Sequence, residues 1–169
     1  MNHEKRHPGR DDLTGEHIWG DAGQLVLFVL FMVLWVADMF FLKSSEAIRN
    51  AMPVAITLPL AVLILIASAY MARTGLKKVF GEVQESPGVI RSGVFNIVRH
   101  PIYLSALLLY CGMLLLAFSQ WAALVWLVAI PFYHYLALFE EKMLLKRFGE
   151  SYRAYMKEVP MWIPKLKRK

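Results

Sequence analysis

The stretch Arg99-His100-Pro101-Ile102-Tyr103 joins a basic loop to a long apolar run. Proline suits the first position of a helix, because its ring fixes a helical φ and its missing N–H would have no partner there. We therefore predict a helix that begins at Pro101, with His100 at its N-cap position and Tyr103 on the same face. Unpaired backbone N–H groups and the positive end of the helix dipole then face the loop, which suits an anionic ligand group.

Four apolar runs predict the fold. They cover residues 22–42, 52–71, 102–118 and 121–139, the third being the shortest. Each run is close to the ~20 residues that a helix needs to cross a ~30 Å hydrocarbon layer. The chain is 57% hydrophobic and its charges gather between the runs, which is not typical of a soluble domain. We predict an all-α integral membrane protein with four transmembrane helices.

The last two runs are separated only by Ser119 and Gln120. Such a short connection predicts a tight antiparallel hairpin, so the far ends of the two helices lie together. The hairpin therefore places residues 99–103 beside Glu140 and Glu141.

The distribution of positive charge predicts the orientation. All but two of the 19 Lys and Arg residues fall in segments that would share one side of the membrane with both termini. By the positive-inside rule that side is the cytoplasm, which predicts a protein of the cell membrane with both termini cytoplasmic. A net charge of +6 also suits nucleic acid. However, the chain has no compact basic domain with interleaved aromatics, so we expect membrane lipids as neighbours and no nucleic-acid partner.

Two segments outside the runs face the cytosol in this arrangement. Residues 72–101 mix charges with Val, Phe and Ile, and their glycines are expected to break any long helix, which predicts a cytosolic interfacial loop. The tail, residues 140–169, is predicted to form an amphipathic C-terminal helix that lies on the membrane surface or closes a cavity at the mouth of the hairpin. The apolar face of this helix holds Leu145, Phe148, Tyr152 and Tyr155.

The runs and the tail form one predicted membrane domain, residues 22–169, preceded by an N-terminal cytosolic arm at residues 1–21. The arm repeats the tripeptide as Arg6-His7-Pro8, but no apolar run follows it. The histidines of the arm have no metal-ligand spacing, so we predict no metal site.

Asp38 and His134 lie inside the predicted spans, where polar residues are costly. Asp38 is close to the end of the first span, so we expect it to reach water or to pair with Lys43 in a structural role. His134 follows Pro131 by three residues and lies on roughly the same face as Glu141. It either lines a pocket or bonds to a neighbouring helix or to a carbonyl that the proline frees.

Several motifs resemble one enzyme family. They are the run from Gly93 to Tyr103, the apolar hairpin, Glu140-Glu141, Phe148-Gly149, Tyr152, Tyr155, Val159-Pro160 and Ile163-Pro164. Over roughly residues 88–164 the chain resembles the isoprenylcysteine carboxyl methyltransferase family and its phospholipid methyltransferase relatives. The resemblance implies a membrane-embedded methyltransferase that uses S-adenosylmethionine, in a cytosol-open pocket formed by the last two spans and the tail. It also implies that His100 and Tyr103 match the cofactor motif and that Glu140 and Glu141 match its acidic pair.

The residues suit this cofactor chemically. A helix start with Arg99 or His100 suits a carboxylate, an acidic pair suits cationic and hydroxyl groups, and aromatic rings stack on adenine. Methyl transfer from a sulfonium needs alignment and exclusion of water more than acid catalysis, so no nucleophile and base pair is required. The candidate cofactor-binding residues are Arg99, His100, Tyr103, Glu140, Glu141, Tyr152 and Tyr155.

The prediction about the acceptor comes from one position at which this chain differs from the family that it resembles. Glu158 stands where the prenylcysteine enzymes typically carry an arginine suited to the carboxylate of the acceptor. An anion there would repel a carboxylate, so an amine or a neutral lipophilic or lipid-linked acceptor is easier to accommodate. For a basic amine, Glu158 or Glu141 would take up a proton, and Glu158 and His134 are the candidate catalytic residues.

Two other functions remain open. Membrane sterol reductases, which use NADPH, carry a similar Arg-His motif before a late helix, although their chains have many more spans. A non-enzymatic membrane scaffold is the third possibility, in which Arg99 binds lipid phosphate and the acidic pair bonds to Lys142 and Lys146.

Overall fold

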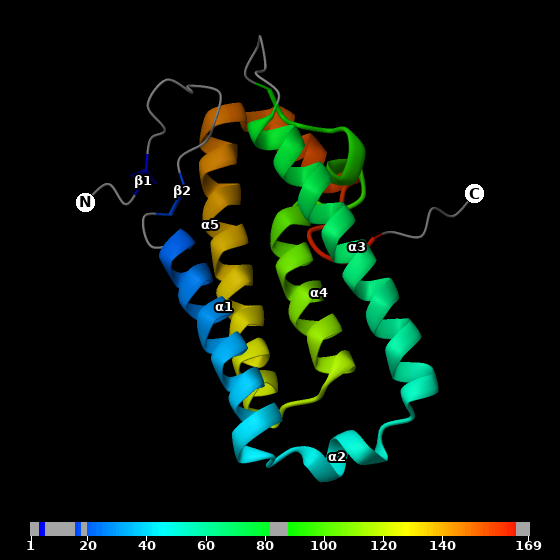
Figure 1. The fold of residues 1–169 in the computed structure, drawn as a ribbon. Helices are drawn as coiled ribbons and strands as arrows, with labels where there is room; N and C mark the ends of the chain where they lie inside the picture. Colours follow the sequence, from blue (N-terminus) through cyan, green and yellow to red (C-terminus); the bar gives the residue numbers. More distant parts are fainter. Residues whose placement is uncertain (1–3, 6–15, 18–19, 82–87, 165–169) are drawn as a thin grey trace.

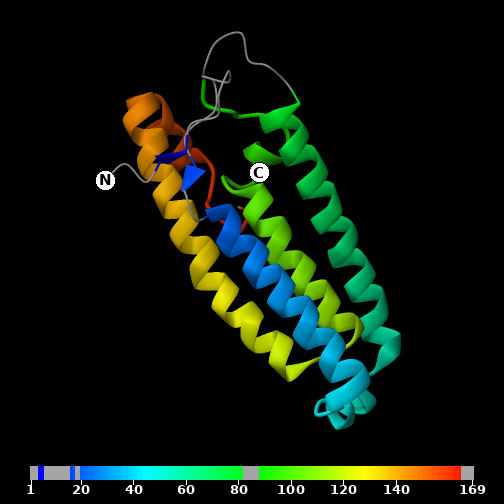
Figure 2. The same ribbon diagram turned by 60° about the vertical axis from the view of Figure 1, so that its left-hand side comes forward.

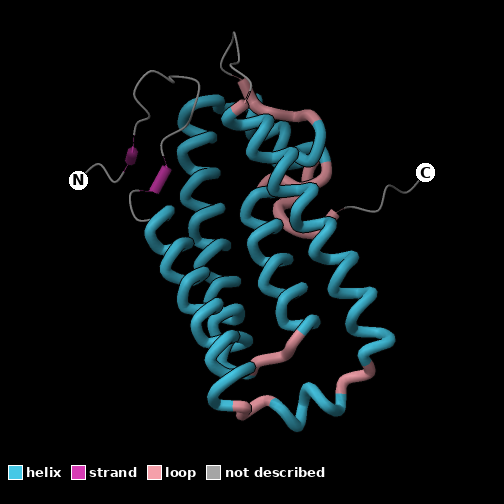
Figure 3. Tube along the Cα trace, viewed as in Figure 1, coloured by secondary structure: helices cyan, strands magenta, loops and turns pink. Residues whose placement is uncertain are grey.

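The structure is a computed structural model and describes residues 4–5, 16–17, 20–81 and 88–164. These residues are almost entirely helical (Figure 3), which confirms the predicted all-α class. The tripeptide Arg6-His7-Pro8 and residues 82–87 of the predicted loop lie outside the described residues. The elements are β1 (Glu4–Lys5), β2 (Glu16–His17), α1 (Gly20–Ala37), the π-helical η1 (Asp38–Leu42), α2 (Glu46–Ala51), α3 (Val54–Phe80), the 3₁₀ turn η2 (Gly93–Asn96), α4 (Pro101–Leu116) and α5 (Gln120–Glu158).

Four long helices run side by side, and α2 lies across one end of the bundle (Figure 1). Both views place α4 between α3 and α5, with α1 packed on α5 (Figures 1 and 2). The other end, where α4 begins, is called the cavity end below. The pair β1 and β2 is a two-residue antiparallel ladder.

Three stretches of the described chain are long and apolar enough to cross a membrane: Gly20–Leu42, Val54–Phe80 and Gln120–Glu158. The sequence predicted four. The third predicted run forms α4, which is apolar but only 16 residues long, or about 24 Å. It ends early because Ala117 is extended and leads directly into Ser119, whose side chain caps α5 by accepting from the Ala122 N–H (3.3 Å).

Helix α3 continues to Phe80, past its predicted end at residue 71. The prediction that glycines break the helix was wrong for Gly75, because this glycine is a packing position. A Cβ on Gly75 would lie 2.9 Å from the Ile102 side chain of α4. Close packing of α3 on α4 thus offsets the cost of a glycine inside a helix, about 1 kcal/mol, and the interfacial loop begins only at Gly81.

The fourth run continues without a break into the first part of the tail, and a kink then separates it from a second helical segment within α5. Gly149 interrupts it with φ 51° and ψ −124°, and the chain turns back toward α4 from there (Figure 1). The predicted aromatic face does not lie on the membrane surface. Tyr152 and Tyr155 are buried against Val89, Leu144, Leu145 and Phe148, so the face packs inside the protein.

Asp38 holds the end of the bundle near α2, but Lys43 is not its partner as predicted. Its carboxylate is fully buried and accepts from Ser44 Oγ (2.7 Å) and the Ser45 N–H (3.3 Å). Arg49 lies 3.9 Å from it and also donates to the Phe118 carbonyl (3.2 Å). Asp38 therefore links the corner between α1 and α2 to the connection between α4 and α5, which is a structural role.

Candidate functional site

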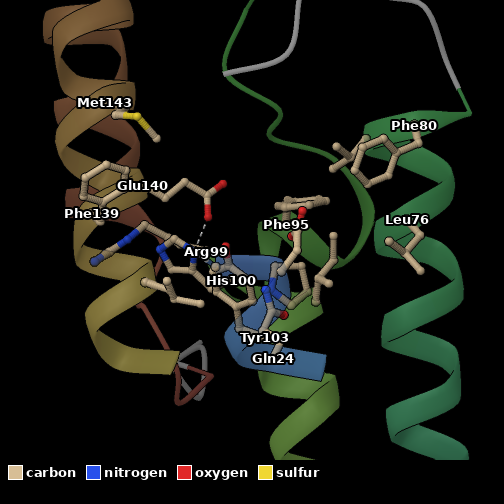
Figure 4. A pocket seen from close by; sticks show the side chains of 16 residues that line it. Gln24, Leu76, Phe80, Phe95, Arg99, His100, Tyr103, Phe139, Glu140 and Met143 are labelled. Carbon is tan, nitrogen blue, oxygen red and sulfur yellow. Dashed lines mark ion pairs between the residues drawn. The ribbon is translucent and has the colours of Figure 1, made fainter. Parts of the chain in front are cut away.

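A cavity of about 250 Å³ opens at the cavity end (Figure 4). Its volume is just below the ~300 Å³ at which small-molecule pockets usually begin. Helices α1, α3, α4 and α5 all contribute to it. The polar lining residues are Asp21, Gln24, Arg99, His100, Tyr103 and Glu140, and the apolar ones include Leu76, Val79, Phe80, Phe95, Ile102, Leu136, Phe139 and Met143.

Helix α4 begins as the sequence predicts. Pro101 is its first residue and His100 occupies the N-cap position with φ −120° and ψ 63°. The His100 side chain makes no capping hydrogen bond, however. The start of α4 therefore has no side-chain cap where it lines the cavity, and its first-turn N–H groups suit an anion.

The His100 ring is instead held between two carboxylates of α5, as the predicted hairpin requires. Nε2 lies 3.1 Å from Glu141 Oε1, and Nδ1 lies 3.5 Å from Glu140 Oε2. The ring is only 4% exposed. Burial on its own would lower the pKa of His100, but the hydrogen bonds and charges of Glu140 and Glu141 raise the pKa to about 9. The ring is thus a buried imidazolium at neutral pH.

Arg99 holds the returning tail against the start of α4. Its Nε donates to Glu141 Oε1 (2.7 Å), and its Nη1 donates to the carbonyls of Met156 (3.1 Å) and Val159 (2.7 Å). Its backbone N–H donates to the Pro160 carbonyl (2.9 Å). Arg99 lines the cavity, but its guanidinium bonds to the protein from several directions.

Two aromatic rings lie close to His100. Tyr103 stacks on it with ring centroids 5.8 Å apart and planes 8° apart, so the predicted shared face is confirmed. The Trp162 ring lies 5.9 Å away. Trp162 had no signal in the sequence, because it lies in an irregular part of the tail and reaches His100 only through the return at Gly149.

The other predicted site residues lie outside the cavity lining. Glu141 lies directly behind His100. Tyr152 and Tyr155 lie in the buried tail cluster, where the Tyr155 hydroxyl donates to the carbonyl of Phe95 (2.5 Å), a lining residue.

The two candidate catalytic residues are both exposed. Glu158 lies 3.8 Å from Arg91, and His134 Nδ1 accepts from Trp162 Nε1 (3.1 Å). Of the two interpretations for His134, the structure shows a hydrogen bond to a neighbouring segment.

Sequence reasoning missed the contribution of α1. Asp21 and Gln24 of α1 line the cavity. A signal was present, since Gln24 and Asp38 are the polar residues of an otherwise apolar run. Phe95 was also missed, because its place depends on the fold of the loop.

Comparison with known proteins identifies the family of this chain. A family model described as phospholipid methyltransferase matches residues 51–151, which is more than half of the chain. The matched segment holds Arg99, His100, Tyr103 and Glu140 of the cavity. No curated protein and no solved structure matches the chain. The match confirms, at the level of the family, the resemblance seen in the sequence, and the chain belongs to the phospholipid methyltransferase family, a family of membrane methyltransferases.

Proposed function

We propose that this protein transfers a methyl group from S-adenosylmethionine to a lipophilic acceptor, with the cofactor bound in the cavity at the start of α4. One observation carries the proposal. Within the family-matched segment, an uncapped helix start, a buried imidazolium and a carboxylate line one cavity. The cofactor supplies an electrophilic methyl group on a sulfonium, and the residues of the chain hold it.

The lining residues suit the groups of this cofactor. The uncapped start of α4 and the charged ring of His100 suit its carboxylate. The partly exposed side chain of Glu140 suits its ammonium or ribose hydroxyls, and Tyr103 and Phe95 suit its adenine. These residues would bind and orient the cofactor and exclude water, which is what a direct displacement requires.

The remaining predicted residues would support the residues that line the cavity. We assign Arg99 and Glu141 as positioning residues, because Arg99 joins Glu141 to the tail and Glu141 holds His100. Tyr155 supports Phe95 in the same way. Tyr152, His134 and Glu158 stay predictions from the sequence.

In the membrane, α4 would cross together with the three longer helices, as part of a single domain. Its core residues Tyr110 and Leu114 pack against α1 and α5, so it does not lie apart from them. Four crossings place both termini on one side, and the positive-inside rule makes that side cytoplasmic. The cavity would then open where a soluble cofactor is present.

The alternatives gain no support. The family is one of methyltransferases rather than reductases. Glu141 bonds to Arg99 and His100, not to Lys142 or Lys146 as the scaffold would require.

The proposal is tested by calorimetric titration of the purified protein with S-adenosylhomocysteine and with NADPH. We expect the first to bind and the second not to. Tyr103→Ala, which removes the ring that would stack on the adenine, should weaken S-adenosylhomocysteine binding by about 1 kcal/mol. His7→Ala, in the repeated tripeptide, is the matched control and should change nothing. Binding of NADPH alone, or of neither ligand, would contradict the proposal.

A further inference from the structure

Helix α1 lies outside the family-matched residues 51–151, yet it supplies one wall of the cavity. Its approach to α5 is fixed at Gly23, where a Cβ would lie 2.5 Å from the Phe132 ring. No larger residue allows the two helices to pack this closely. The contact brings the next residue, Gln24, to the cavity near Tyr103 (Figure 4).

Gln24 differs from the other polar residues of this site. His100 and Arg99 are bonded to carboxylates or carbonyls of the protein. The carboxamide of Gln24 is half-buried and makes no hydrogen bond to another described residue. An amide with unused donors and acceptor is costly where it is withdrawn from water, so a partner from outside the chain would stabilise it.

One wall of the cavity is apolar. It consists of Leu76, Val79 and Phe80 at the end of α3. Leu76 and Phe80 are each 44% exposed, so the apolar wall continues to the outside of the bundle, where α3 would meet lipid chains. The cavity therefore offers the polar side chains of α1 and an apolar wall on α3, which suits an amphiphile.

We propose that Gln24 determines the acceptor specificity of the methyltransferase proposed above, by hydrogen bonding to the polar head of an amphiphile whose chain lies along the end of α3. Asp21 lines the cavity three residues before Gln24 and so on the same face of α1, which favours a cationic or neutral hydrogen-bond donor over an anion beside Gln24. The inference rests on the proposed function. A cationic amine head would first lose one proton to water, and the lone pair freed on its nitrogen would then form the nitrogen–methyl bond as the sulfur–methyl bond breaks, which would leave a neutral thioether.

The test uses the full chain in detergent micelles with methyl-tritiated S-adenosylmethionine. Two probes share one chain and differ in the head: oleylamine and oleic acid. We expect label in oleylamine and little in oleic acid. Gln24→Leu should raise the KM for oleylamine about fivefold, as for one lost hydrogen bond, and change the affinity for S-adenosylhomocysteine less than twofold. Gln24→Glu keeps an acceptor oxygen and should bring the KM below that of the leucine variant.

Leu25→Met is the control on the same turn, because Leu25 is 62% exposed and does not line the cavity. Leu25→Met should change neither the KM for oleylamine nor the affinity for S-adenosylhomocysteine. An unchanged KM in Gln24→Leu, or an equal loss of S-adenosylhomocysteine affinity, would overturn the role of Gln24. Cofactor binding without transfer to oleylamine would overturn the head-group inference and leave the proposed function standing. If the unmutated protein binds no S-adenosylhomocysteine, the proposed function itself fails.

Discussion

His100 occupies the capping position of α4 without capping it, because both ring nitrogens face carboxylates of α5. Two consequences follow from this one side chain. The helix start stays open to a ligand, and the positive charge of the ring becomes part of the packing between α4 and α5. His100 therefore affects both ligand binding and the stability of the fold.

The charge on His100 predicts how stability depends on pH. Its pKa of about 9 in the folded protein lies above the ordinary value of 6.5. The stabilisation from this group is therefore complete below pH 6.5 and is lost as the pH rises through about 9. The melting temperature of the cofactor-free protein should fall over this range, and His100→Gln should flatten the fall. If the melting temperatures of the unmutated protein and of His100→Gln fall in parallel with pH, the raised pKa of His100 is contradicted.

The adjacent carboxylates predict separable effects. Glu141 is buried between Arg99 and His100, so Glu141→Gln should cost about 3 kcal/mol of stability by breaking a buried ion pair. Glu140 is partly exposed and lines the cavity, so Glu140→Gln should weaken S-adenosylhomocysteine binding by about 1.5–3 kcal/mol and change stability less. Melting and calorimetric titration of both variants give the comparison. A larger loss of stability in Glu140→Gln, together with a larger loss of binding in Glu141→Gln, would contradict these roles.

Among the elements, α5 has the strongest effect on the site, because it supplies the acidic pair and then turns back at Gly149. The return places Val159 and Pro160 where Arg99 bonds to their carbonyls. Trp162 reaches the His100 ring by the same route. The geometry of the tail therefore depends on the backbone of one glycine.

Gly149→Ala tests this dependence. A Cβ there meets nothing within 4 Å, so any effect comes from the backbone, whose positive φ is strained for other residues. We expect a loss of about 1–3 kcal/mol in stability, together with weaker S-adenosylhomocysteine binding. Glu150→Ala, at the exposed neighbouring position, is the control and should stay within about 0.5 kcal/mol. Equal melting temperatures for Gly149→Ala and the unmutated protein would show that the turn does not need glycine.

The elements also show which features a sequence reveals. Run length and hydropathy are local properties, and they predicted the positions of α1, α3, α4 and α5. The fit of Gly75 depends on Ile102 of another helix, so α3 was predicted too short. The partners of Asp38 were missed for the same reason, since they are fixed by the corner at Ser44 and Ser45 and not by the nearest basic residue.

The residues of the candidate site also divide into those that the sequence predicted and those that it did not. The helix start at Pro101 and the pairing of His100 with the acidic residues followed from the sequence, because a two-residue connection leaves little freedom to the hairpin. The return of the tail and the wall formed by α1 depend on contacts between distant segments. Gln24 was nonetheless visible as a polar residue in an apolar run.

For the bundle in a membrane, the number of crossings predicts the sides of the termini. Four crossings place reporters before Met1 and after Lys169 on the same, cytoplasmic side, whereas three place them on opposite sides. A cysteine at Glu46 of α2, in a Cys111→Ser background, should react with an impermeant thiol reagent from outside the cell. Labelling only after permeabilisation would reverse the orientation and remove the cavity from cytosolic cofactor.

The buried Asp38 gives this bundle one fixed end, and a rod that is fixed at one end moves most at the other. Glu140 lies about 30 Å along α5 from Gln120, whose N–H bonds to Ser45 beside Asp38. A tilt of about 5° at that pivot would move Glu140 by roughly 2.5 Å, given this lever arm. Glu141 would move with it, so the ion pairs of Glu141 with Arg99 and His100 hold the cavity end against such a tilt.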